Sequence, residues 1–74
     1  MTTTLRAAII GTGNAAAMHA TALRALPDAE LIAVCSRDSG RAATFAAKHG
    51  VPRHYDSLSA MLADPDIDAV HVCT

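Results

Sequence analysis

The stretch Gly11-Thr12-Gly13-Asn14-Ala15-Ala16 decides the fold, because it joins an apolar run at 5–10 to a helix-forming segment at 14–26. Gly11 can adopt backbone angles closed to other residues and lets a strand turn sharply. Gly13 lacks a Cβ, so a phosphate can approach the main chain there, and Ala16 is small enough to pack a helix against the strand. Strand, glycine turn and helix in succession predict a phosphate-binding corner.

The expected helix after this turn supplies the means of holding an anion. Its first amide groups have no partners within the helix, and its dipole is positive at this end. Asn14 is expected to be the N-cap. A strand–helix corner can also need glycines for purely steric reasons, but the position of this one favours phosphate binding.

Strands and helices are predicted to alternate along the whole chain. Strands are expected at 5–10, 30–35, 53–55 and 67–73, and helices at 14–26, about 40–49 and 57–63. Asp38 or Ser39 should cap the second helix, Gly50 should end it, and Ser57 should cap the third. The alternation predicts an α/β fold, the N-terminal half of a doubly wound parallel Rossmann sheet of the order β-α-β-α-β-α-β.

Several side chains are expected to have a structural role only. Apolar and aromatic residues recur at helical spacing in the second and third helices, which predicts the inner stripes Ala42, Phe45, Ala46 and His49, and Leu58, Met61 and Leu62. His71 and Tyr55 should also be structural. Cys35 and Cys73 should end strands two places apart in the order 3-2-1-4, too far apart for a disulfide.

Composition excludes several classes of partner. The net charge is −1 and the six Lys and Arg residues are scattered, so no nucleic acid partner is expected. No run approaches the roughly 18 apolar residues of a membrane span, which favours a cytoplasmic protein without a membrane partner. The four histidines are dispersed and neither cysteine lies in a CxxC motif, so no metal site is expected.

The residues after the second strand indicate which nucleotide is bound. An Asp or Glu at this place binds the ribose 2′-hydroxyl of NAD, but this chain has Ser36 followed by Arg37. Ser can donate a hydrogen bond to a 2′-phosphate and Arg can pair with it, so NADP is favoured, with NAD still possible. Arg41, one helical turn further on, could close over the same phosphate or could be an ordinary surface charge.

Three segments together resemble the glucose-fructose oxidoreductase and inositol dehydrogenase family, often called Gfo/Idh/MocA. They are the runs at 11–19, 33–38 and 68–74, and with them the match spans nearly the whole chain. The most specific features are His19, three residues after Ala16, and the Asp-Ala-Val-x-x-x-Thr strand that begins at Asp68. The departures are Ala16 in place of Gly and Ser36 in place of the commoner Asp.

The resemblance implies an NAD(P)-dependent oxidoreductase that transfers hydride between a nicotinamide and a sugar, polyol or related small hydroxy compound. Residues 1–74 would be the N-terminal part of its dinucleotide-binding domain, with the remaining strands and a C-terminal substrate domain absent from this chain. That second domain often carries the subunit interface, so a homo-oligomer is expected. The family's catalytic Lys and His lie beyond Thr74, so no catalytic residue is named and the segment alone should be inactive.

The resemblance also places the cofactor-binding residues. Those expected around the pyrophosphate are Gly11, Thr12, Gly13, Asn14 and Ala15. Ser36 and Arg37 would meet the adenosine ribose, and Cys73 and Thr74 the adenine-side wall. His19 is expected to pack locally rather than to touch substrate.

Two alternatives of other classes stay open. Methyltransferases that use S-adenosylmethionine also begin with a strand and a glycine-rich turn, but they usually have an acidic residue where Ser36 stands. A non-catalytic nucleotide sensor is compatible with every residue of the chain. Because the fourth strand is central in a complete Rossmann sheet, its unpaired edge at 70–73 should make the isolated segment unstable or self-associating.

Overall fold

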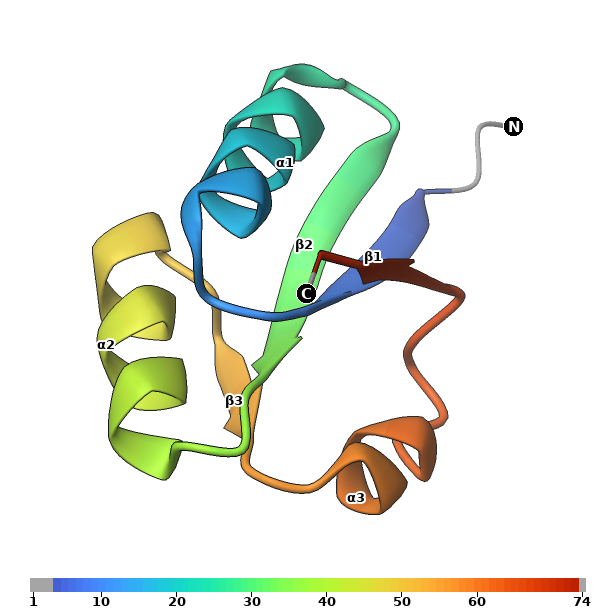
Figure 1. The fold of residues 1–74 in the computed structure, drawn as a ribbon. Helices are drawn as coiled ribbons and strands as arrows, with labels where there is room; N and C mark the ends of the chain where they lie inside the picture. The colour runs from blue at the N-terminus through green and yellow to red at the C-terminus, as the bar shows by residue number, and fades with distance from the viewer. Residues whose placement is uncertain (1–3, 74) are drawn as a thin grey trace.

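The computed structural model describes residues 4–73, which form a four-stranded parallel sheet covered by helices on both faces (Figure 1). The strands are β1 (Leu5–Ile10), β2 (Ala29–Cys35), β3 (Arg53–Tyr55) and β4 (Ala69–Val72), in the order β3-β2-β1-β4. The helices are α1 (Asn14–Ala25), α2 (Ser39–His49) and α3 (Leu58–Leu62). The predicted fold class and strand order are confirmed.

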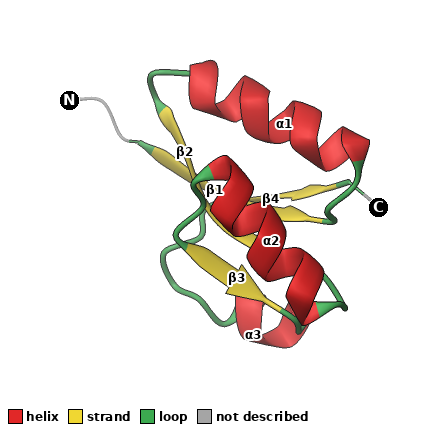
Figure 2. Cartoon of the chain, turned by 90° about the vertical axis from the view of Figure 1, so that its left-hand side faces the viewer, coloured by secondary structure: helices red, strands yellow, loops and turns green. Residues whose placement is uncertain are grey.

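Helices α1 and α2 cover one face of the sheet, and α3 lies on the other (Figures 1 and 2). Ala16 and Ala20 of α1 are fully buried against the first face. Because an alanine methyl group keeps the helix axis close to the strands, this packing explains why Ala16 can occupy the third place of the glycine pattern. The inner stripe of α2 is confirmed for Ala42, Phe45 and Ala46, while His49 is half-buried.

An irregularity in β2 decides which of its side chains face which layer. Ala7 of β1 pairs with Leu31, but the next residue, Ala8, pairs with Ala33. Ile32 is therefore an extra residue, as in a β-bulge. As a result, Ile32 and Ala33 both pack on the α3 side, although neighbouring residues of a regular strand point to opposite faces.

The predicted inner stripe of α3 is wrong at two of its three positions. Met61 is fully buried, but Leu58 and Leu62 are 47% and 60% exposed. The helix is only five residues long, less than one and a half turns, and contacts only β2 and β3. A helix this short meets the sheet at one point, so the flanks of its apolar stripe remain in solvent.

Most predicted helix ends are confirmed by their local geometry. Asp38 caps α2 by accepting a hydrogen bond from the Arg41 amide at 3.1 Å, and Ser57 caps α3 through the Ala60 amide at 3.4 Å. Gly50 ends α2 in the left-handed conformation, with φ of 67°. β4 begins two residues later than predicted, at Ala69.

An ion-pair network joins the amino ends of β1 and β3 to the loop before β4, and we call it the amino-end network. Its members are Arg6, Arg53, Asp64, Asp66 and Asp68. The Asp64 carboxylate, 6% exposed, lies 2.7 Å from the Arg53 guanidinium and accepts a hydrogen bond from the Tyr55 hydroxyl. The backbone amide of Asp66, the Tyr55 hydroxyl and the Arg53 guanidinium lower the pKa of Asp64 to about 2. Tyr55 is therefore structural, as predicted.

Candidate nucleotide-binding site

Gly11 makes the turn that leaves β1. Its φ of 117° lies in the region that side-chain-bearing residues rarely adopt. The Gly11 amide donates to the Cys35 carbonyl at 2.9 Å, so the turn begins within the hydrogen-bonded sheet. Because Gly11 has no side chain, the chain turns toward α1 here without backbone strain.

Gly13, not Asn14, is the N-cap of α1, so that prediction is wrong. The first helical bond runs from the Ala17 amide to the Gly13 carbonyl at 3.0 Å, which makes Asn14 the first helical residue. No side chain caps this helix start. A Cβ built on Gly13 would meet no atom of the described chain within 4 Å. The space beside Gly13, at the start of α1, is therefore not filled by any atom of residues 4–73.

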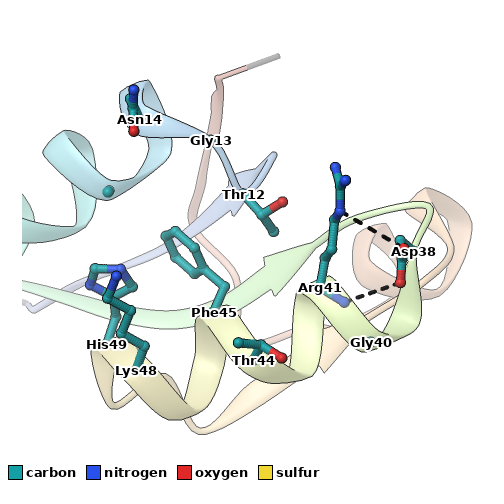
Figure 3. Close-up of a pocket in the computed structure, with 11 residues that line it drawn as sticks. Thr12, Gly13, Asn14, Asp38, Gly40, Arg41, Thr44, Phe45, Lys48 and His49 are labelled. Atoms are coloured by element: carbon teal, nitrogen blue, oxygen red, sulfur yellow. Dashed lines mark hydrogen bonds and ion pairs between the residues drawn. The ribbon is translucent and has the colours of Figure 1, made fainter.

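The start of α1 and one side of α2 border an open cavity of about 650 Å³ (Figure 3). Its lining residues are Thr12, Gly13, Asn14, Ala17, Asp38, Gly40, Arg41, Thr44, Phe45, Lys48 and His49. Two of these are cations, Arg41 and Lys48, and one is an anion, Asp38. Unpaired amides on one wall and cations on the other suit a negatively charged ligand.

The loop at 36–38 leads from β2 into this cavity and is held by its own hydrogen bonds. The Ser36 hydroxyl accepts from the Asp38 amide at 3.3 Å. The hydroxyl proton of Ser36 is therefore left free to donate to a ligand. Arg37 is exposed and takes part in none of the ion pairs found among residues 4–73.

The structure brings some of the residues expected from the sequence together and leaves others apart. Thr12, Gly13, Asn14 and Arg41 line the cavity. Gly11, Ala15, Ser36 and Arg37 border it in sequence but are not part of its lining. Cys73 follows β4, where its amide donates to the Ile10 carbonyl at 2.9 Å, and Thr74 lies outside the described residues.

Sequence reasoning identified Arg41 but missed Thr44 and Lys48 of α2, which also line the cavity. Arg41, Thr44 and Lys48 are spaced by three and four residues, which places them on one side of a helix. This spacing was available in the sequence as a signal. Asp38 was expected only as a cap, yet it also lines the cavity.

The histidine and cysteine side chains near the turn have structural contacts. His19 of α1 packs against His71 of β4, with ring centroids 5.6 Å apart. Cys35 is buried, and desolvation together with the charge of Asp56 raises the pKa of its thiol. Burial also raises the pKa of Cys73. As predicted, β1 lies between the strands that lead to these two cysteines, and both thiols are free.

Within residues 4–73, no helix has the length and apolar character needed to cross a membrane.

Comparison with known proteins identifies the fold and the family. Residues 5–74 match the model of the Gfo/Idh/MocA oxidoreductase family, described as its NAD-binding Rossmann fold. The chain is 38% identical over 72 residues to trans-1,2-dihydrobenzene-1,2-diol dehydrogenase of Bos taurus. It is 36% identical over 70 residues to 4-carboxy-2-hydroxymuconate-6-semialdehyde dehydrogenase of Sphingobium. Each alignment covers 95% of this chain but 22% of the relative, so the chain spans about a fifth of these proteins' length.

Solved structures give the same result. Myo-inositol dehydrogenase from Lactobacillus casei, in complex with NAD(H) and myo-inositol, is 32% identical with a TM-score of 0.87. A 3-ketoreductase from Actinomadura kijaniata, in complex with NADP and TDP-benzene, is 32% identical with a TM-score of 0.88. Each of these two alignments covers 96% of this chain. They cover 22% of the inositol dehydrogenase and 23% of the ketoreductase. One neighbour holds NAD and the other NADP. Nothing in these matches supports the methyltransferase or sensor alternatives. The chain belongs to the Gfo/Idh/MocA oxidoreductase family and corresponds to its NAD-binding Rossmann fold.

Proposed function

We propose that this chain binds the pyrophosphate of a nicotinamide dinucleotide at the start of α1, as part of an oxidoreductase. The observation that carries the proposal is the uncapped helix start at Gly13, where an added Cβ would meet no atom of the described chain. Neither its φ of −84° nor its packing gives a reason for glycine here rather than an N-cap residue with a capping side chain such as Ser. Room for a ligand phosphate close to the amides supplies that reason.

The test is Gly13→Ala in the full-length protein, with binding of reduced nicotinamide dinucleotides followed by fluorescence. The new methyl group would stand where the pyrophosphate approaches, so affinity should fall by about tenfold or more, the value of one charge-assisted hydrogen bond. The matched control is Gly50→Asn, since Asn tolerates the left-handed conformation and Gly50 lies outside the cavity. Unchanged affinity in Gly13→Ala would contradict the proposal.

NADP is proposed as the preferred cofactor, with its 2′-phosphate bound by Ser36, Arg37 and Arg41. Three observations support this preference: the free hydroxyl proton of Ser36, the exposed guanidinium of Arg37 outside every described ion pair, and Arg41 in the cavity lining. A 2′-phosphate accepts hydrogen bonds from all three donors. The remaining expected contacts, Ala15, Cys73 and Thr74, complete the proposed cofactor site.

Arg37→Ala tests this preference directly. It should weaken NADPH binding by about tenfold, as expected for a charged hydrogen bond, and leave NADH binding nearly unchanged. Arg24→Ala removes an exposed arginine at the other end of α1 and should change neither affinity. Equal losses for the two cofactors in Arg37→Ala would refute the role of Arg37.

The whole protein is proposed to move hydride between NAD(P) and a sugar, polyol or related hydroxy compound. The nicotinamide supplies or accepts the hydride, while the residues described above hold and orient the phosphates of the cofactor. The names of the relatives support this substrate class, because a dihydrodiol dehydrogenase and an inositol dehydrogenase both point to vicinal hydroxyl groups. Turnover of vicinal diols and inositols by the full-length protein, read from absorbance of the reduced cofactor, tests it. Tight cofactor binding without turnover of any such compound would favour a nucleotide sensor.

Further strands and a C-terminal substrate domain are proposed to complete the protein, which would be a homo-oligomer in the cytoplasm. The edge strand β4 supports the further strands, since Val72 on it is 71% exposed and nothing in residues 4–73 pairs with its outer side. The isolated chain of 74 residues should therefore self-associate in sedimentation experiments. A monomer with cooperative unfolding would contradict this proposal.

A further inference from the structure

Asp38 and Arg41 are opposite charges within the proposed cofactor cavity (Figure 3). The Asp38 carboxylate accepts a hydrogen bond from the Arg41 amide at 3.1 Å and lies 3.9 Å from the Arg41 Nε. Both side chains are open to solvent, 61% and 76% exposed. An ion pair of this kind is weak, so a ligand can break it at little cost.

The position of the Asp38 carboxylate is fixed by the chain around it. The carboxylate caps α2, and the Asp38 amide donates to the Ser36 hydroxyl. A Cβ built on Gly40 would lie 3.2 Å from Asp38 Oδ1, so glycine at that position leaves room for the carboxylate. Asp38 therefore cannot swing away from Arg41 without uncapping the helix.

A negative charge held here acts against a 2′-phosphate and not against a 2′-hydroxyl. A phosphate monoester carries a charge of about −1.5 to −2 at pH 7. It therefore competes with the Asp38 carboxylate for Arg41, and it is also repelled by that carboxylate, which stays in place. A ribose hydroxyl meets no such penalty and can donate a hydrogen bond to a carboxylate.

We propose that Asp38 determines cofactor specificity by competing with the 2′-phosphate for Arg41. This inference rests on the proposed function, and it assigns opposite effects to neighbouring residues. Ser36, Arg37 and Arg41 favour NADP, while Asp38 reduces that preference and keeps the site open to NAD. The protein should accordingly accept both nucleotides.

The test compares Asp38→Asn with the wild-type full-length protein, because an Asn side chain can still cap α2 but carries no charge. Affinities for NADPH and NADH are measured by fluorescence, and those for adenosine 2′,5′-bisphosphate and ADP by calorimetry. The variant should bind NADPH and the bisphosphate about fivefold more tightly, the value of one exposed charge interaction. Its affinities for NADH and ADP should not rise, because a ribose 2′-hydroxyl is not repelled by the carboxylate that the variant removes. Asp28→Asn, which removes an exposed carboxylate outside the cavity, should change none of the four affinities.

Arg41→Gln completes the experiment. It should weaken NADPH binding. Adding Asp38→Asn to Arg41→Gln should then raise the NADPH affinity clearly less than Asp38→Asn raises it when Arg41 is present. Equal gains in both backgrounds, or an unchanged or weaker NADPH affinity in Asp38→Asn alone, would overturn the inference. If the wild-type protein binds neither dinucleotide, both the proposed function and this inference are refuted, whereas binding with an unaltered cofactor preference refutes the inference alone.

Discussion

The two ends of the strands differ in how their polar groups are satisfied. At the amino ends of β1 and β3, Arg6 and Arg53 are paired with Asp64, Asp66 and Asp68 in the amino-end network. At the carboxyl end of β1, the first amides of α1 have neither a capping side chain nor an acidic residue in the first turn. The charged side chains of the amino-end network are paired within the chain, while at the start of α1 no side chain of residues 4–73 caps the first amides.

The neighbouring helix shows that the unpaired start of α1 is specific to that position. α2 begins at the same edge of the sheet, but Asp38 caps it. The same fold therefore supports both arrangements, and the sequence chooses between them by placing Asp before one helix and Gly before the other. An uncapped helix start costs stability, and it is compatible with a ligand that replaces the missing cap.

The largest effect on stability is expected when the turn before α1 is changed. Gly11→Ala forces a Cβ into a backbone with φ of 117°, which should lower the free energy of unfolding by about 1–3 kcal/mol in urea titrations. Gly13→Ala is the matched control, because its φ of −84° suits any residue, and it should change stability by less than about 1 kcal/mol. Equal losses of stability in the two variants would mean that the backbone at Gly11 does not require glycine more than the backbone at Gly13 does.

The cap of α2 should have the next largest effect. Asp38→Ala removes the acceptor of the Arg41 amide and should destabilise the protein by about 1 kcal/mol, measured by thermal unfolding. Asp38→Asn should retain most of the wild-type stability. If Asn and Ala destabilise equally, the charge of Asp38 rather than its hydrogen bond would be responsible.

The amino-end network should show its contribution in acid. The pKa of Asp64 falls from 3.8 to about 2 in the folded protein, so the folded state binds the proton less readily than the unfolded chain. The stability contributed by this carboxylate is therefore complete above about pH 4 and is lost as the pH falls toward 2. Because Arg53 and Asp66 are about 40% exposed and solvent screens them, we expect a smaller effect than from the Asp38 cap.

Urea unfolding at pH 7, 4, 3 and 2 measures this dependence. Asp64→Asn should lower stability at neutral pH, and its difference from wild type should shrink between pH 4 and 2. Asp28→Asn, on the exposed loop before β2, should keep the wild-type pH dependence. A difference between Asp64→Asn and wild type that is constant from pH 7 to 2 would contradict the assignment.

The smallest change in stability is expected for Gly13→Ser, and its sign is opposite. The new hydroxyl can cap the free amides of α1, which should raise stability by about 0.5 kcal/mol. The same hydroxyl occupies the proposed phosphate position, so NADPH affinity should fall. Greater stability together with weaker binding would confirm that the amides are left unpaired for a ligand, and unchanged binding would contradict it.

The sequence was sufficient to predict the strand order, the turn and two helix caps, because each depends on local and well-understood preferences. Glycine at positions 11 and 50 adopts positive φ, and Asp38 and Ser57 accept hydrogen bonds from helix amides, as their residue types favour. Alternation of strands and helices is enough to imply parallel pairing.

Features that depend on packing between distant segments could not be predicted in the same way. Leu58 and Leu62 have the right spacing for a buried stripe, but whether a helix stripe is covered depends on how much of the sheet lies beneath it. The α2 wall of the cavity depends on how close α1 and α2 approach each other. For Asn14, residue type favoured a cap, and the path of the chain after Gly11 started the helix one residue earlier.

The extra residue Ile32 determines on which side of the sheet the chain leaves β2. In a strand of regular alternation, Cys35 would share the face of Leu31, on the side of α1 and α2, and Ser36 would point the opposite way. With Ile32 inserted, Val34 has that side and Cys35 packs with Met61, so continued alternation would turn Ser36 to the side of the sheet that α1 and α2 cover. Deleting this one apolar residue, more than 10 Å from Ser36 along an extended chain, would reverse the direction of every later side chain of the strand. The orientation of the proposed cofactor contact is thus decided by the length of β2 as much as by the identity of residue 36.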